Sequence, residues 1–155
     1  MAQRAVLHVV LVTAQQRLYD GPAEMVNAPG GDGQLGILPL HAPLLTTLKS
    51  GELQVRNGGV DESIFVSGGF LEVNDNVVTI LADDAERASD IDEEAAQEAR
   101  RRAQATLDAR QGGEAQIDAQ IALDRAVGRL RVAESHRQRS GRRRATPQEQ
   151  QELGQ

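Results

Sequence analysis

The chain has 155 residues, of which 39% are hydrophobic and 2% aromatic, and its formal net charge is −6. It contains no cysteine, which excludes a disulfide framework and a thiolate metal site. No apolar stretch reaches the ~18 residues that a membrane-spanning helix needs, and the first residues lack the features of a signal peptide. We therefore expect a soluble protein of the cytosolic side, with one domain or one domain plus an appendage.

The charges are unevenly placed along the chain. Up to Ala85 there are four basic and ten acidic residues, whereas from Glu86 onward thirteen arginines balance thirteen acids. Within this second part the acids come first and the arginines last. The asymmetry predicts a basic end that meets an acidic partner surface or nucleic acid, and a solvated helix face is the alternative.

The first part of the chain, to about residue 87, has the pattern of β-strands. The apolar run from Val6 to Val12 is typical of a strand that is buried on both faces. Turn residues at 20–22, 30–33, 57–59 and 74–76 separate shorter apolar pieces. Those pieces lie at 25–28, 35–38, 53–56, 63–66, 70–73 and 77–81. Short strands with frequent turns predict an antiparallel β-sandwich of about ten short strands over residues 1–87.

From about residue 88 the pattern becomes helical. Ser89 or Asp90 is expected to cap a first helix, which runs to about Arg110 and ends at Gly112 and Gly113. A second helix is expected from near Glu114 to about residue 139. Its apolar residues recur at helical spacing: Ile117, Ile121, Leu123, Val127 and Leu130. We predict a helical hairpin over residues 88–140 and a polar, disordered tail over 141–155.

The first helix is expected to pack mainly through alanines, among them Ala95, Ala96, Ala99 and Ala103. Burial of apolar surface contributes ~25 cal/mol per Å², so an alanine methyl stabilises a contact far less than a leucine does. We therefore expect the hairpin to stay helical while docking weakly on the sandwich, from which it can detach.

No pattern in the sequence predicts catalysis. Gly31-x-Gly33-x-x-Gly36 matches the dinucleotide-binding spacing, but Pro39 and Pro43 forbid the helix that must follow it, so a hairpin turn is the better interpretation. The serines have no recognisable base partner, and there is no phosphate-binding loop. The sequence therefore predicts a protein that is not an enzyme.

Metal and nucleic-acid sites are equally unsupported. His8, His41 and His136 lack a second ligand at metal spacing, and Asp83-Asp84 has no calcium-loop spacing around it. The arginine-rich stretch 125–144 could contact phosphates, but it contains no aromatic side chain on which a base could stack. We expect no metal, no cofactor and no nucleic-acid partner.

Four ordered segments resemble the epsilon subunit of bacterial and chloroplast F-type ATP synthases. The first is the run from Gly33 to Leu45, which reads GQLGILPLHAPLL. It is followed by Lys49–Leu53, Val66–Val73 and Leu81–Ala88. The resemblance covers about residues 5–139 and includes Leu130-Arg131-Val132 in the second predicted helix.

The resemblance implies a non-catalytic central-stalk subunit of a proton-translocating ATP synthase. In the family, the β-sandwich binds the gamma subunit and rests on the c-ring, which couples rotation to ATP synthesis. The hairpin folds against the sandwich, or extends along gamma into the catalytic alpha/beta hexamer and blocks ATP hydrolysis. Such a subunit is peripheral to the membrane, on the cytoplasmic face of the bacterial inner membrane or the stromal face of the thylakoid.

The resemblance also implies particular partner-binding residues. Gln34, His41 and Leu44 are expected on the face toward gamma and the c-ring. A hydrogen bond that stabilises the loop is the alternative role of His41. Basic residues of the second helix are expected to meet an acidic segment of the catalytic subunits, and the candidates are Arg125, Arg129, Arg131, Arg137 and Arg139.

Two positions depart from the family pattern. Some members bind ATP through Ile/Leu-Asp-x-x-Arg-Ala, and here the motif is degenerate: Ile91, Asp92, Ala95 and Ala96 align with it, so alanine replaces the arginine. Without that cation the motif argues against ATP binding, for which Arg100 and Arg125 are the possible replacements. Gln34 stands where a glutamate is usual, so a charged contact there is lost or becomes a neutral hydrogen bond.

Two other classes of function remain open from the sequence. A stand-alone β-sandwich adaptor would use the basic helical tail as a peptide ligand, and it would not co-purify with a membrane ATPase. A nucleic-acid-binding protein would show steeply salt-dependent binding to DNA.

Overall fold

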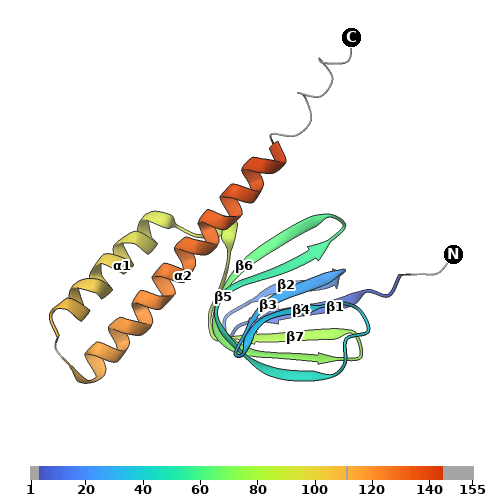
Figure 1. Ribbon diagram of the computed structural model, residues 1–155, viewed down its shortest axis with the longest axis horizontal. Helices are drawn as coiled ribbons and strands as arrows, with labels where there is room; N and C mark the ends of the chain where they lie inside the picture. The colour runs from blue at the N-terminus through green and yellow to red at the C-terminus, as the bar shows by residue number, and fades with distance from the viewer. Residues whose placement is uncertain (1–3, 111, 145–155) are drawn as a thin grey trace, which may run out of the picture.

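The computed structural model describes residues 4–110 and 112–144, which form a β-sandwich followed by two helices (Figure 1). The strands are β1 Leu7–Val12, β2 Arg17–Ala23, β3 Met25–Gly30, β4 Gly33–Ile37, β5 Leu44–Asn57, β6 Val60–Asn74, β7 Val77–Ala82 and β8 Ala85–Arg87. A 3-10 turn, η1 Ala88–Asp90, leads to the helices α1 Glu93–Asp108 and α2 Gly113–Arg144. The predicted order of a sandwich and then a helical hairpin is confirmed.

The strands form one sheet in the order β2-β1-β7-β6-β5-β3-β4, and β8 pairs with β6. The described residues contain eight strands rather than about ten, because predicted neighbours merge: pieces 63–66 and 70–73 both lie in β6, which has 15 residues. The prediction of an entirely antiparallel sheet is also wrong at one place. β1 and β7 pair in parallel, with Val9 opposite Val78.

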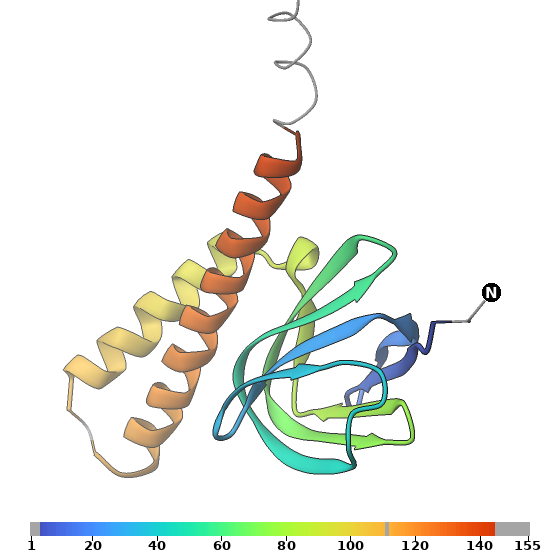
Figure 2. The ribbon, with the colours of Figure 1, turned by 45° about the vertical axis from the view of Figure 1, so that its right-hand side comes forward.

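The long strands β5 and β6 bend and carry the sheet from one layer into the other (Figures 1 and 2). On β6 the buried side chains include Ile64 and Val66 before the bend, and Leu71 and Val73 after it, so the inward positions change from even to odd numbers. The change occurs at Gly68 and Gly69, whose φ angles of 118° and 131° belong to a region that favours glycine. The two layers therefore share a continuous hairpin.

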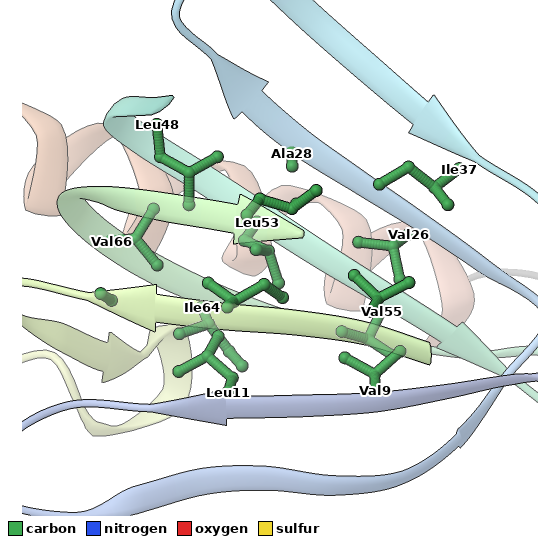
Figure 3. Packing of buried hydrophobic residues seen from close by; sticks show 14 of the residues in the cluster. Val9, Leu11, Val26, Ala28, Ile37, Leu48, Leu53, Val55, Ile64 and Val66 are labelled. Carbon is green, nitrogen blue, oxygen red and sulfur yellow. The ribbon is translucent and has the colours of Figure 1, made fainter. Parts of the chain in front are cut away.

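The core between the layers is formed by aliphatic side chains from all eight strands (Figure 3). Val9, Leu11, Val26 and Ile64 are fully buried, and each comes from a strand that also carries outward side chains. β1 shows this clearly, since His8 between Leu7 and Val9 is exposed. The prediction that β1 is buried on both faces is therefore wrong: its outer face is covered by no second layer.

Three of the four predicted turns are confirmed. Asp75 and Asn76, with φ angles of 48° and 62°, connect β6 to β7, and Gly58 and Gly59 connect β5 to β6. The glycines at 31–33 form the β3–β4 hairpin, so the dinucleotide-like pattern runs into a strand, as expected. Residues 20–22 instead lie within β2, paired with β1. Proline is tolerated there because β2 is an edge strand of the sheet order.

The helix boundaries correct two predictions. Asp92, not Ser89 or Asp90, caps α1: its carboxylate accepts a hydrogen bond from the Ala95 amide at 3.0 Å. α2 continues through Gly141 to Arg144, about five residues beyond the predicted end. A single glycine costs a helix only about 1 kcal/mol, and the arginines after it are good helix formers. From residue 145 on, the predicted disordered tail lies outside the described residues.

Of the two helices, only α2 packs closely on the sandwich, and α1 packs on the side of α2 that faces away from the sandwich (Figure 2). Two of the alanines predicted for the packing face of α1, Ala96 and Ala103, are buried, whereas Ala95 is exposed, so that part of the prediction is wrong. α2 buries Ala119 and Ala126. The predicted apolar stripe of α2 is wrong at one end, since Ile117 and Ile121 are exposed. These isoleucines lie near the free end of the hairpin, which extends past the sandwich.

The contact between α2 and the sandwich is a small apolar cluster. Phe65 on β6, Ala88 and Val132 are buried there, and Ile91 packs against them. At Gly128 the helix comes so close that an added Cβ would lie 2.8 Å from the Phe65 ring. Glycine thus sets the distance at which α2 docks.

Candidate partner-binding sites

The five arginines predicted to meet an acidic partner do not lie on one face of α2. Arg129 Nε donates to the Glu86 carboxylate at 2.9 Å, and Arg137 donates to Glu93 at 2.9 Å. Arg139 pairs with Glu52 of β5. Arg125 and Arg131 are exposed. In the docked hairpin three of the five guanidinium groups are thus already paired within the chain.

The degenerate motif at the start of α1 has a structural role. Ile91 packs in the docking cluster, the Asp92 side chain caps the helix, and Ala96 is buried. Ala95, at the position of the missing arginine, is exposed. The motif residues therefore stabilise the helix start and its docking, and these roles require no ligand.

A cavity of about 520 Å³ lies between the hairpin and the sandwich. The charged residues that line it are Arg125, Arg129, Asp84, Glu86 and Asp118. Three carboxylates would repel a triphosphate, and one of the two arginines is engaged by Glu86. These residues do not fit ATP, in agreement with the motif, and the absence of ATP binding stays a prediction.

The residues expected on the gamma and c-ring face occupy different environments. Gln34 is exposed on β4, next to the β3–β4 turn. The His41 ring is hydrogen-bonded through Nδ1 to the Ala42 carbonyl oxygen at 2.6 Å, beside the β6–β7 turn. Leu44 is half-buried and packs against the sandwich core, so it offers a partner only part of its side chain.

An exposed apolar surface, which the sequence analysis missed, lies on the outer face of β5, β6 and β7. It consists of Leu45, Phe70 and Leu81, which are 72%, 55% and 54% exposed. Phe70 and Leu81 are directly opposite in the β6–β7 pairing, and Phe70 faces Thr47, two residues along from Leu45. We call these three residues the outer apolar patch.

The signal for this patch was present in the sequence. β7 reads VVTILA, with apolar residues at consecutive positions where a half-exposed strand would alternate with polar ones. The inward residues Val78 and Ile80 fill the core, which leaves Leu81 and Val77 facing outward. Neighbouring exposed apolar side chains of this size are typical of a protein–protein interface.

The described residues contain neither a cluster of three metal-ligating side chains nor a helix long and apolar enough to cross a membrane. His8 pairs with Asp20 at 2.8 Å on the outer side of β1 and β2. The surface of the described residues therefore offers apolar and charged side chains for contact with a partner.

Comparison with known proteins decides between the open classes of function. Residues 6–88 match the family model described as ATP synthase, Delta/Epsilon chain, beta-sandwich domain, and residues 89–134 match the corresponding long alpha-helix domain. This chain belongs to the ATP synthase delta/epsilon chain family. The resemblance drawn from the four sequence segments is thereby confirmed, as is the assignment to a non-catalytic subunit of ATP synthase.

Individual relatives agree with the family match. The ATP synthase epsilon chain of Alkalilimnicola ehrlichii is 47% identical over 137 residues, which cover 88% of this chain and 98% of the relative. That of Herpetosiphon aurantiacus is 47% identical over 133 residues, covering 86% and 98%. The alignments thus span nearly the whole of these relatives.

Solved structures give the same result. A chain of the Euglena gracilis mitochondrial ATP synthase, in a structure of OSCP, F1 and the c-ring, superposes with a TM-score of 0.71 at 28% identity. It covers 83% of this chain and 81% of that one. A chain from the central stalk and c-ring of the Tetrahymena thermophila enzyme shares the fold at 17% identity, with a TM-score of 0.51 and coverage of 87% and 98%.

Proposed function

We propose that the β-sandwich of this subunit binds the gamma subunit and the c-ring of ATP synthase, and that its hairpin inhibits ATP hydrolysis. The observation that best supports the first part is the outer apolar patch, which no other described residue covers. Structures that hold similar chains are assemblies of F1 with the c-ring or of the central stalk. A sandwich fixed to the rotor turns with it, which helps couple proton-driven rotation to ATP synthesis.

The patch has the composition of a binding surface. Leu45, Phe70 and Leu81 supply an aromatic and two aliphatic anchors, and the core of a stable interface is depleted in charge and enriched in such side chains. We propose gamma as the partner because the resemblance implies that the sandwich binds this subunit of the central stalk. The two-layer sandwich holds the three side chains of the patch at fixed positions. A preformed surface of this kind binds with little loss of conformational entropy.

Replacing Phe70 with glutamate tests this assignment. A carboxylate buried in an apolar interface without a partner should weaken binding to gamma by about 100-fold or more, the magnitude typical of a hot-spot residue. Binding of the full chain to isolated gamma can be measured by calorimetry. Ile117→Glu is the matched control, since Ile117 is 61% exposed on the hairpin and lies outside the patch.

Unchanged affinity of Phe70→Glu for gamma would place the gamma interface elsewhere on the sandwich. Equal losses in Phe70→Glu and Ile117→Glu would show that added negative charge, rather than the patch, weakens binding.

We propose the loop between β4 and β5, together with Gln34, as the contact with the c-ring. Leu38 and Leu40 in this loop are 56% and 79% exposed, and the Leu40 amide donates to the Asn76 side chain at 2.7 Å, which ties the loop to the β6–β7 turn. His41 fixes the loop through its bond to Ala42, so its proposed role is to hold the apolar residues in place. A neutral Gln34 suits a contact made by hydrogen bonding.

The hairpin is proposed to inhibit hydrolysis by detaching from the sandwich and entering the catalytic hexamer. Two features support this: its docking cluster is small, and its far end exposes Ile117 and Ile121. Once detached, α2 would present Arg125, Arg129, Arg131, Arg137 and Arg139 to an acidic segment of the catalytic subunits.

Deletion of residues 88–155 tests the inhibitory role. Because the sandwich core draws only on residues 7–85, the truncated chain should still fold and bind the rotor. The assembled complex should then hydrolyse ATP severalfold faster, at unchanged rates of ATP synthesis. Equal hydrolysis rates with and without the hairpin, in complexes of equal subunit content, would rule out inhibition.

The location follows from the assembly. We propose that the chain lies at the cytoplasmic face of the bacterial inner membrane and reaches it through the complex. Its epsilon-chain relatives come from bacteria such as Alkalilimnicola ehrlichii, which supports the bacterial rather than the plastid setting.

A further inference from the structure

The last part of α2 extends beyond the family's helical domain. The family model of that domain ends at residue 134, whereas α2 continues to Arg144. This segment, Ser135–Arg144, lies against the β5–β6 hairpin of the sandwich, and two of its arginines, Arg139 and Arg143, contact carboxylates of that hairpin.

Arg139 makes the central contact of the segment. Its guanidinium donates through Nη2 to the Glu52 carboxylate and, at 3.3 Å, to the Ser63 hydroxyl, and through Nη1 to the Ser135 hydroxyl at 2.5 Å. Ser63 Oγ in turn donates to Glu52 at 2.5 Å. Ser63 is 4% exposed and the Glu52 side chain 22% exposed, so this ion pair is largely shielded from water.

Arg143 repeats the arrangement one turn later. It donates to the Gly59 carbonyl oxygen at 3.2 Å and to the Asp61 carboxylate at 3.3 Å, at the turn of the β5–β6 hairpin. The Asp61 side chain is 19% exposed and also accepts from Arg56 at 2.8 Å. The Arg143 side chain is 56% exposed, so this contact contributes less than the better shielded pair of Arg139 and Glu52.

We propose that Ser135–Arg144 is a latch that holds the hairpin docked, with Glu52 and Asp61 as its receptors on the sandwich. When α2 leaves the sandwich, Glu52 loses its guanidinium partner, which makes undocking unfavourable. The same carboxylates compete with any acidic partner for Arg139 and Arg143, since a guanidinium bound to Glu52 cannot be bound elsewhere. Only this competition rests on the proposed function; the latch itself does not.

Glu52→Gln tests the latch on the sandwich side and leaves every arginine of α2 in place. Because the chain has no cysteine, Ala14→Cys and Ala115→Cys create a single pair of sites for spin labels, one on the sandwich and one near the free end of the hairpin; both positions are exposed. Pulsed electron resonance on the isolated full chain then measures the distance between them. We expect Glu52→Gln to raise the ratio of undocked to docked chains about tenfold, seen as a second, longer and broader distance.

Glu62→Gln is the matched control. Glu62 is another carboxylate of the β5–β6 pair, but its partner is Arg87 at 3.0 Å, within the sandwich. We expect it to keep the docked distance. Arg139→Gln should reproduce the effect of Glu52→Gln from the helix side without altering the sandwich. An unchanged distance in both latch variants, or equal broadening in Glu62→Gln, would overturn the proposal.

The latch and the inhibitory function can fail separately. The spin-label distance in the isolated chain reports the latch, whatever the hairpin does in the assembled enzyme. Hydrolysis by the complex carrying Glu52→Gln reports the function, and it should fall if the released hairpin inhibits. A longer distance with unchanged hydrolysis would support the latch and contradict inhibition.

Discussion

Replacing Gly69 with alanine is expected to lower the free energy of unfolding of the sandwich by about 3–5 kcal/mol. Two costs add. The φ angle of 131° is one that side chains with a Cβ rarely adopt, and an added Cβ would lie 2.1 Å from the Leu81 carbonyl oxygen of β7. The Leu81 oxygen is a backbone atom and the position of a Cβ is fixed by its own backbone, so no side-chain rotation relieves the contact, and β6 and β7 must separate at the bend that joins the two layers.

Urea unfolding followed by tyrosine fluorescence measures this effect. Tyr19 is the only tyrosine, there is no tryptophan, and Tyr19 packs against the sandwich core. Burial, together with the nearby Glu62 carboxylate, raises the pKa of Tyr19 in the folded chain. An unperturbed tyrosine has a pKa of about 10, so at pH 7 the phenol is neutral in both the folded and the unfolded chain.

Gly33→Ala separates the two costs. Gly33 has nearly the same φ, 132°, but an added Cβ would meet no atom within 4 Å. We expect this variant to lose only about 1–2 kcal/mol. If Gly69→Ala were no less stable than Gly33→Ala, the close approach of β7 would not be what requires glycine.

Replacing Gly128 with leucine is expected to release the hairpin while the sandwich and the helices remain folded. The Phe65 ring lies 2.8 Å from the position of an added Cβ, and Phe65 is 2% exposed, so a leucine side chain must displace either the buried ring or the helix. Overpacking of this kind costs about 1–3 kcal/mol, which is enough to shift the docking equilibrium by up to about 100-fold. Leucine also favours the helix over glycine, so α2 itself should become more stable.

The distance between spin labels at residues 14 and 115 measures docking in this variant, and far-ultraviolet circular dichroism measures its helix content. Gly141→Leu is the control, because Gly141 also lies in α2 but an added Cβ there meets no atom within 4 Å. Retention of the docked distance in Gly128→Leu would show that the apolar cluster does not set the position of α2. If the hairpin inhibits hydrolysis as proposed, Gly128→Leu should also make the complex more strongly inhibited.

Some candidate sites are formed by residues close in sequence, which a local pattern can reveal, whereas others are formed by residues that only the fold brings together. The run from Gly33 to Leu45 identified the family because its residues are close in sequence. The outer apolar patch joins Leu45, Phe70 and Leu81 from three strands, and strand pairing alone brings them together. Likewise, Arg139 was expected, from the family resemblance, to meet an acid outside the chain, whereas in the docked hairpin its acid is Glu52, 87 positions away.

The sequence by itself determined the order of a β-sandwich and a helical hairpin, most turns, and the alanine contact between the helices, because periodicity and turn chemistry act over a few residues. Only the tertiary structure decided that β6 continues through the bend at Gly68 and Gly69, that β1 and β7 pair in parallel, and that α2 covers Phe65. Phe65 and Ile64 are adjacent and both buried, on opposite sides of β6. A local pattern cannot show that the second face of β6 is covered, because the residues of α2 that pack on Phe65 lie more than 60 residues further along the chain.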